Sequence, residues 1–132
     1  MDISVNQFNN SLDFNLSNSS KGKSEFRIFY QNIRSLKNKI AEIEILTNNY
    51  KADLLILTET WITEQEKLFY NINNYNSFYS CRKRQGGGLG LFLHDSFEQK
   101  IIENFQSEEH ACIIMKIDKL RLIIIASYRP PS

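Results

Sequence analysis

The stretch DLLILTETW, residues 53–61, decides the fold. Its four consecutive apolar residues, Leu54 to Leu57, are typical of a strand that is buried on both faces. One threonine later comes a carboxylate, Glu59, at the point where such a strand should end. In α/β folds, ligands bind beyond the ends of strands of this kind. The stretch therefore predicts a buried strand that carries a functional group at its end.

The residues before this stretch predict an earlier strand and a helix. EFRIFYQNI, residues 25–33, alternates and is rich in aromatic and β-branched residues, which indicates a strand. Ser35 is suited to cap a following helix. The apolar face of that helix recurs at helical spacing and consists of Leu36, Ile40, Ile43, Leu46 and Tyr50. Strand, helix and strand in this order form a βαβ unit, which favours neighbouring parallel strands.

The residues after this stretch predict antiparallel strands. Residues 77–83 and 89–95 flank a glycine-rich turn and predict a hairpin. Residues 99–105, 111–118 and 121–128 are three further strands, and the last two lie close enough in sequence to form a second hairpin. The expected fold class is α/β, with an α/β beginning followed by antiparallel strands.

Residues 1–25 differ in composition from the rest of the chain. Eleven of these 25 residues are Asn or Ser, and the apolar residues among them are scattered. Such a segment buries too little apolar surface to offset its ordering entropy. We therefore expect a disordered polar leader over residues 1–25, followed by a domain over residues 26–132.

The bulk properties of the chain exclude some classes of protein. The chain has 132 residues and a net charge of +1, so a strongly basic nucleic-acid-binding domain is excluded, although a local basic patch is not. Two cysteines do not form a disulfide framework. The longest apolar run, residues 122–126, is far shorter than a membrane span, and the N-terminus lacks the pattern of a signal peptide. These features predict an intracellular protein without a membrane partner.

Two polar residues at predicted strand ends are candidates for a functional site. Asn32 lies near the end of the first strand, where it is either a side chain aimed into a cleft or an ordinary turn residue. Glu59 follows the second strand and suits a hard cation such as Mg²⁺, which takes oxygen ligands and keeps several waters. The alternative for Glu59 is a solvated residue that begins the next loop.

The glycine-rich segment GGGLG, residues 86–90, is not a phosphate-binding loop. A Walker loop ends in Gly-Lys-Ser/Thr before a helix, whereas a strand-like segment follows here. The glycines are expected to serve a tight turn and close strand packing. Beside them, Arg82, Lys83 and Arg84 are either contacts to DNA phosphates or solvated charges of the hairpin.

The histidines and cysteines carry no pattern of a catalytic or metal site. His94 and His110 show no spacing to a carboxylate or nucleophile, so we expect surface or strand-edge positions for both. Cys81 and Cys112 lie within apolar strands, where we expect them to be buried and inert.

Taken in order, FYQNIRSLKNKI, LLILTETW, GGGLGLFL and ASYRPPS resemble one family. The chain resembles, over residues 26–132, the N-terminal half of the endonuclease domain of non-LTR (LINE-type) retrotransposons, which belongs to the endonuclease/exonuclease/phosphatase superfamily. The resemblance implies a partial two-sheet α/β sandwich whose second half is missing, with helices packed outside and the active site at one end. It also implies a Mg²⁺-dependent hydrolase that nicks DNA in the nucleus, so that the reverse transcriptase domain of the same element can begin synthesis.

The resemblance implies roles for three residues. Asn32 and Glu59 match the residues that hold the metal, and Tyr128 matches the tyrosine that orients the phosphate. Two motifs that the family carries further along, resembling Gly-Asp-Phe-Asn and Ser-Asp-His, are not in this sequence, and His94 and His110 lie in the wrong segments to replace them. We therefore expect the chain to be a fragment that does not nick DNA alone, because no matched residue activates water. The alternatives are a non-catalytic DNA-binding remnant and another phosphoesterase of the superfamily.

Overall fold

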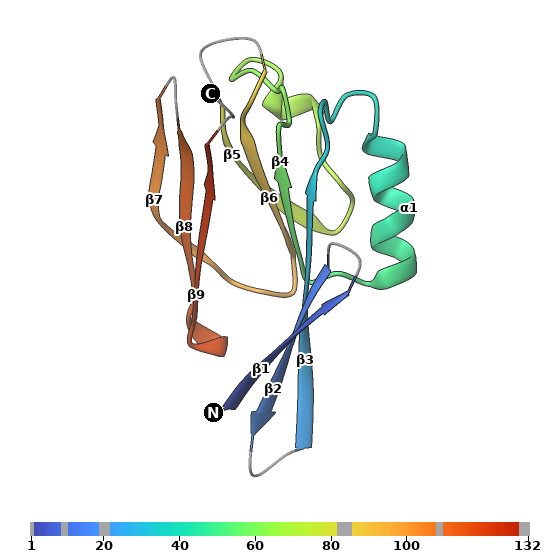
Figure 1. Ribbon diagram of the computed structural model, residues 1–132, viewed down its shortest axis with the longest axis vertical. Helices are drawn as coiled ribbons and strands as arrows, with labels where there is room; N and C mark the ends of the chain where they lie inside the picture. The colour runs from blue at the N-terminus through green and yellow to red at the C-terminus, as the bar shows by residue number, and fades with distance from the viewer. Residues whose placement is uncertain (1, 9–10, 19–21, 82–85, 108–109, 130–132) are drawn as a thin grey trace.

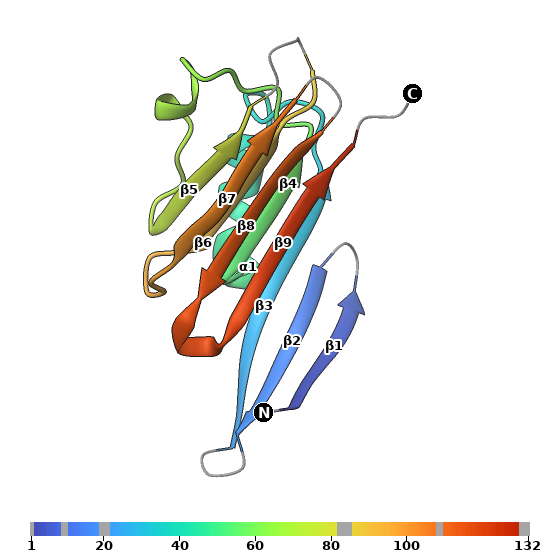
Figure 2. The same ribbon diagram turned by 90° about the vertical axis from the view of Figure 1, so that its left-hand side faces the viewer.

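The structure is a computed structural model that describes residues 2–8, 11–18, 22–81, 86–107 and 110–129, with side chains from residue 25 onward. In this part of the chain the strands form two sheets that pack against each other (Figure 1). Helix α1 covers the outer face of the larger sheet, as Figures 1 and 2 show from two sides. The predicted α/β sandwich is confirmed.

The larger sheet has the strand order β1-β2-β3-β4-β6-β5. Strands β3 and β4 are parallel and are joined by α1, so the predicted βαβ unit is confirmed. Strand β6 pairs antiparallel with both β4 and β5, which confirms the first predicted hairpin. The bounds of these elements are β1 Asp2–Phe8, β2 Ser11–Asn18, β3 Gly22–Asn32, α1 Ile40–Tyr50, β4 Leu54–Thr58, β5 Tyr75–Ser80 and β6 Leu89–His94.

The smaller sheet is antiparallel and has the order β7-β8-β9. Its strands are β7 Lys100–Gln106, β8 Ala111–Ile117 and β9 Leu122–Tyr128. A short 3-10 turn, η2 Asp118–Leu120, joins β8 to β9 and completes the second predicted hairpin. Every second residue of β9 is buried, so this strand presents one face to the interior of the sandwich.

The two apolar cores lie on opposite faces of β4. Leu54 belongs to the core between the two sheets, whereas Leu55 and Leu57 belong to the core between the larger sheet and α1. All three side chains are at most 1% exposed. Strand β4 is therefore buried on both faces, as its uninterrupted apolar run predicts.

Helix α1 begins later than the sequence predicts. Ser35 does not cap it, since the helix starts at Ile40 and Lys39 is its N-cap residue, without a side-chain cap bond. Ser35 is buried, and its N–H donates instead to the carbonyl of Glu59. This long-range backbone bond keeps Ser35 out of the helix. No helix in the described ranges is long and apolar enough to cross a membrane.

Residues 1–25, for which we predicted a disordered leader, contain two strands and the start of a third in the described ranges. Strands β1 and β2 form an antiparallel pair, and β2 pairs with β3, so the larger sheet extends to Asp2. Leu12, Phe14 and Leu16 alternate with polar residues, which is the pattern of a strand despite the Asn-rich and Ser-rich composition. A domain boundary at residue 25 remains a prediction.

Candidate functional site

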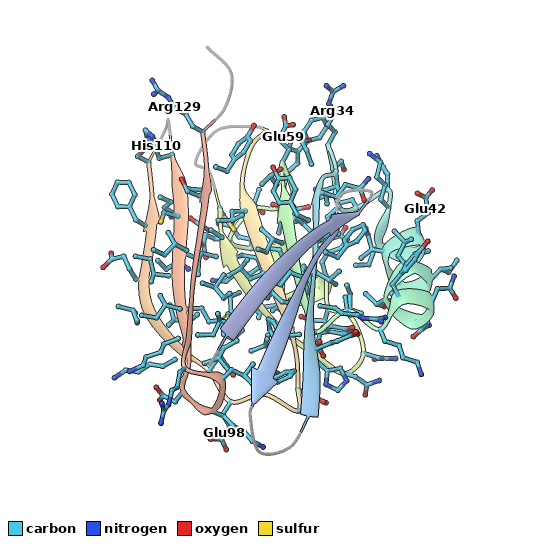
Figure 3. The ribbon with its side chains drawn as sticks, turned by 60° about the horizontal axis from the view of Figure 1, so that its bottom comes forward. Arg34, Glu42, Glu59, Glu98, His110 and Arg129 are labelled. Atoms are coloured by element: carbon cyan, nitrogen blue, oxygen red, sulfur yellow. The ribbon has the colours of Figure 1, made fainter. Side chains whose placement is uncertain are left out.

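The parallel pairing of β3 and β4 brings Asn32 and Glu59 to the same edge of the sheet. Asn32 ends β3 and lies in register with Thr58, the last residue of β4. Glu59 follows directly, and its side chain is half-buried. Figure 3 shows Glu59 at one end of the sandwich. The two candidates that the sequence places at separate strand ends are thus neighbours in the fold.

Backbone hydrogen bonds hold the segment after β4 on both sides. The N–H groups of Glu59 and Trp61 donate to the carbonyls of Gly88 and Gly87, each at 2.9 Å. On the other side, the carbonyl of Glu59 accepts the N–H of Ser35, also at 2.9 Å. The loop before β6 and the loop after β3 therefore fix the backbone of Glu59 between them.

The backbone at this edge is strained. Arg34, Ser35, Glu59 and Trp61 all have positive φ, at 46°, 92°, 55° and 56°. A non-glycine residue in the left-handed region raises the free energy of the folded state by about 1–2 kcal/mol. Strained residues of this kind persist where the surrounding structure determines them, and they gather at functional sites. Four of them at one edge support a functional role for it.

The glycine-rich segment makes room for the residue after Glu59. A Cβ atom on Gly88 would lie 2.7 Å from Oγ1 of Thr60, and one on Gly90 would lie 3.2 Å from Cε1 of Tyr79. Gly88 also has a φ of +92°. The prediction that these glycines serve a turn and close packing is confirmed. Their backbone, rather than any phosphate-binding property, supports the candidate site.

Two buried hydroxyl groups flank Glu59. Thr58 and Thr60 are 1% and 0% exposed, and their Oγ1 atoms have no hydrogen-bond partner in the described part of the chain. A buried polar group without a partner costs about 1–3 kcal/mol. Such groups are rare in proteins, and one explanation is a functional site. The sequence motif shows these threonines but does not show that they are buried.

Tyr128 lies at the end of β9 and is 8% exposed. It pairs with Ala111, the first residue of β8. Figure 3 places its neighbour Arg129, together with His110, at the same end of the molecule as Glu59. The C-terminal end of β9 therefore belongs to the same end of the sandwich as the Asn32–Glu59 edge.

Positive charge also gathers at this end. Arg34 and Arg129 are exposed, and Figure 3 shows both at the end that carries Glu59. Sequence reasoning did not select Arg34, although its position two residues after Asn32 was a usable signal. The predicted phosphate contacts Arg82, Lys83 and Arg84 lie outside the described residues.

The donor set at this edge fits a hard cation. Glu59 offers carboxylate oxygens and Asn32 an amide oxygen, which are ligands that Mg²⁺ accepts when water completes its shell. Among the residues that the structure describes, no three His, Cys, Asp or Glu side chains gather to hold a metal. A metal at this edge would therefore rest on Glu59, Asn32 and water.

His94 lies apart from this edge, whereas Cys81 and Cys112 lie near the strand ends on the side of the candidate site. His94 ends β6 beside Tyr75, at the opposite end of β4 from Glu59, and its Nδ1 lies 2.8 Å from Oγ of Ser96. Cys81 is buried, as predicted, and burial raises the pKa of its thiol to about 11. Cys112 is half-exposed, so its predicted burial is only partly met.

Comparisons of the chain with known proteins agree on the fold. No family model and no curated protein sequence matches. The solved structures include an AP endonuclease, LMAP from Leishmania major, at 13% identity and a TM-score of 0.61, covering 81% of this chain and 40% of that one. Humanized D. rerio TDP2 matches at 16% identity and a TM-score of 0.54, covering 80% of this chain and 47% of that one. The human Nocturnin catalytic domain, with a bound sulfate anion, matches at 13% identity and a TM-score of 0.51, covering 77% of this chain and 48% of that one.

These likenesses define the class of fold. The chain has a fold of the endonuclease/exonuclease/phosphatase type. It spans less than half the length of each of these structures. The predicted fold class, a partial sandwich of this type, is confirmed.

Proposed function

We propose that the chain carries part of the active site of a Mg²⁺-dependent DNA endonuclease. The observation that carries this proposal is the strained Glu59, which a buried strand and two flanking loops fix beside the end of β3. Glu59 and Asn32 would hold the cation, and Tyr128 would orient the phosphate. The AP endonuclease among the similar structures supports this choice of chemistry.

The rigidity of this edge explains how these residues would act. Electrostatic stabilisation is effective when the groups are fixed before the reaction. A bound Mg²⁺ would supply the positive charge that stabilises a reacting phosphate. The chain's own contribution is to hold Glu59 in one backbone conformation and to present Arg34 and Arg129, exposed at the same end, to the DNA backbone.

The resemblance of the motifs supports a more specific role. In this role the domain nicks target DNA in the nucleus, and the reverse transcriptase domain of the same retrotransposon extends the new end. The 132-residue chain by itself is expected not to nick DNA, because the sequence lacks the two later motifs and thus a group that activates water.

A DNA-binding experiment tests the proposal without requiring turnover. Binding of the 132-residue chain to a fluorescent duplex should strengthen when Mg²⁺ is added, and Glu59→Gln should remove most of this effect. The matched control is Glu42→Gln, which changes an exposed carboxylate on α1, away from the candidate site. Equal Mg²⁺ effects in the wild type and in Glu59→Gln would exclude Glu59 as a metal ligand.

Binding of DNA without catalysis is the second candidate function. It is favoured by the exposed Arg34 and Arg129 at one end of the molecule. Binding through phosphate contacts alone weakens steeply with salt and does not need a divalent cation. Salt-sensitive binding that Mg²⁺ leaves unchanged would therefore favour this function. A third possibility, another phosphoesterase of the same fold, predicts binding of small phosphate esters in preference to DNA.

A further inference from the structure

Two apolar side chains project from the loop that follows the candidate site. Leu68 and Phe69, in the 3-10 turn η1 Lys67–Phe69, are 76% and 81% exposed. Among the large apolar side chains in the described ranges, these two are the most exposed. Exposed apolar groups that lie together mark an interaction surface more often than single ones do. We refer to the two side chains as the Leu68–Phe69 pair.

The start of the turn is held by a reciprocal pair of hydrogen bonds. The N–H of Thr63 donates to the carboxylate of Glu66 at 3.3 Å, and the N–H of Glu66 donates back to Oγ1 of Thr63, also at 3.3 Å. This is the arrangement of a capping box. The N–H of Phe69 also donates to the carbonyl of Glu66 at 2.9 Å. The backbone that carries the pair is therefore ordered from its first residue.

Both ends of the loop are anchored in the core. Ile62 and Ile72 are 2% and 4% exposed and belong to the core between α1 and the larger sheet. After the turn, the hydroxyl of Tyr79 donates to the carbonyl of Tyr70 at 2.7 Å. The Leu68–Phe69 pair is thus exposed on a fixed support, so a partner would not have to order the loop first.

The carboxylates beside the pair are neutralised by lysines. Glu64 forms an ion pair with Lys67 at 2.7 Å, and Glu66 forms one with Lys37. These pairs lower the repulsion that the turn would otherwise exert on a phosphate backbone. Exposed Arg34, close in sequence to Lys37, adds positive charge at the same end of the molecule.

The turn lies at the end of the sandwich that holds the candidate site. Figures 1 and 2 show the loop after β4, which includes η1, at the end where β3 and β4 terminate. Trp61, 41% exposed, begins the same loop two residues after Glu59. The candidate site at Glu59 and the pair therefore lie at the same end of the sandwich.

The size of the apolar surface indicates its partner. A stable protein–protein interface buries about 800 Å² on each side. An aromatic side chain contributes only about 200 Å². Two side chains flanked by charged residues fall short of a protein interface, whereas one Leu or Phe is enough to enter a single base step and partly unstack it.

We propose that the Leu68–Phe69 pair is a wedge that enters the base stack of DNA held at the candidate site. The proposal rests on the proposed function and specifies its substrate class, which is duplex DNA at a step that unstacks readily. Pyrimidine–purine steps are such steps, because they are flexible and kink easily. The wedge would position a phosphate next to a distorted step at Glu59.

Fluorescence of 2-aminopurine tests the wedge directly, since this base brightens when it is unstacked. The 132-residue chain is mixed with duplexes that carry 2-aminopurine at a pyrimidine–purine step, with Mg²⁺ present. Binding of the wild type should brighten the probe. The double variant Leu68→Ala/Phe69→Ala should abolish this brightening and weaken binding about tenfold, because contacts of a side chain with a base contribute on this scale.

The matched control removes equally exposed apolar side chains elsewhere. Ile45 and Tyr50 on α1 are 60% and 59% exposed, and Ile45→Ala/Tyr50→Ala should leave brightening and affinity unchanged. Brightening that persists in Leu68→Ala/Phe69→Ala contradicts the proposal that the pair is a wedge. The pair would then be available to a protein partner. If Mg²⁺-dependent, Glu59-dependent binding occurs without brightening in the wild type, only the wedge fails. If no duplex binds, both the wedge and the proposed function fail.

Discussion

Thr60 and Gly88 show how closely the backbone is packed around Glu59. The alanine methyl of Gly88→Ala would meet Oγ1 of Thr60 at 2.7 Å, at a φ of +92°. We expect Gly88→Ala to lower the free energy of unfolding by about 2–4 kcal/mol, from left-handed strain and overpacking together. Urea denaturation measures this loss. Adding Thr60→Ala to Gly88→Ala should restore the part of the unfolding free energy that overpacking removes. If the losses of the two single variants simply add in the double variant, the two residues do not clash.

Thr58 offers a second test at the scale of a residue. Its buried hydroxyl has no hydrogen-bond partner among the described residues, so its desolvation is uncompensated. Thr58→Val keeps the shape and removes the hydroxyl, and we expect it to raise the free energy of unfolding by about 1 kcal/mol. The measurement is again urea denaturation, with exposed Thr63→Val as a variant that loses a hydrogen-bonded hydroxyl and should not be stabilised. Destabilisation by Thr58→Val would show that the hydroxyl makes a stabilising interaction.

At the scale of the element, β5 makes the fold sensitive to alkaline pH. Burial raises the pKa of Tyr79, in β5, and raises that of Cys81, just after it, from 9.0 to about 11. Because the folded state favours the neutral thiol, the contribution of Cys81 to stability is complete below about pH 9 and is lost as pH rises toward 11. We expect the urea midpoint to fall from about pH 8.5 to about pH 10.5, a range that spans the ordinary thiol pKa of about 9, and Cys81→Ala to reduce the fall. An equal fall in the variant would exclude the thiol as a cause.

The elements also show what sequence could predict. The βαβ unit and both hairpins follow from local pattern, because alternation, helical spacing and glycine positions record local burial and turns. The position of Glu59 follows from the apolar run of β4. The conformation of Ser35 does not, since it depends on a hydrogen bond to the distant carbonyl of Glu59. The exposure of Phe69 was equally hidden, because an apolar residue next to a loop is exposed or buried according to long-range packing, which the local pattern does not record.

At the scale of the whole molecule, the outer face of the smaller sheet is apolar. Ile123 and Ile125 on β9 are 56% and 67% exposed, and the strand order places β9 at the edge of its sheet. Exposed apolar edge strands favour association between chains. We expect Ile123→Lys/Ile125→Lys to reduce self-association in sedimentation experiments. Ile45→Lys, a control on exposed α1, should not, and equal effects would point to net charge as the cause.

The two ends of the sandwich differ in what they present. Glu59, Arg34 and Arg129 lie at one end (Figure 3), whereas His94 lies at the opposite end of β4. The larger sheet, with α1 and the smaller sheet packed against it, supports the end that carries Glu59. This arrangement explains why residues far apart in sequence, such as Asn32 and Tyr128, are candidates for one site. Their shared end could be inferred from sequence only through the order of motifs.

The most direct test of the proposed metal site is paramagnetic broadening by Mn²⁺, which takes oxygen ligands like Mg²⁺. Amide NMR signals of the 132-residue chain are recorded while Mn²⁺ is added. If Glu59 and Asn32 hold the metal, signals near residues 32–35, 59–61 and 86–88 should broaden first, and Glu59→Gln should abolish this selectivity. Broadening that begins elsewhere, for example around Asp53 and His94, or that is unchanged in Glu59→Gln, would contradict a metal site at this edge.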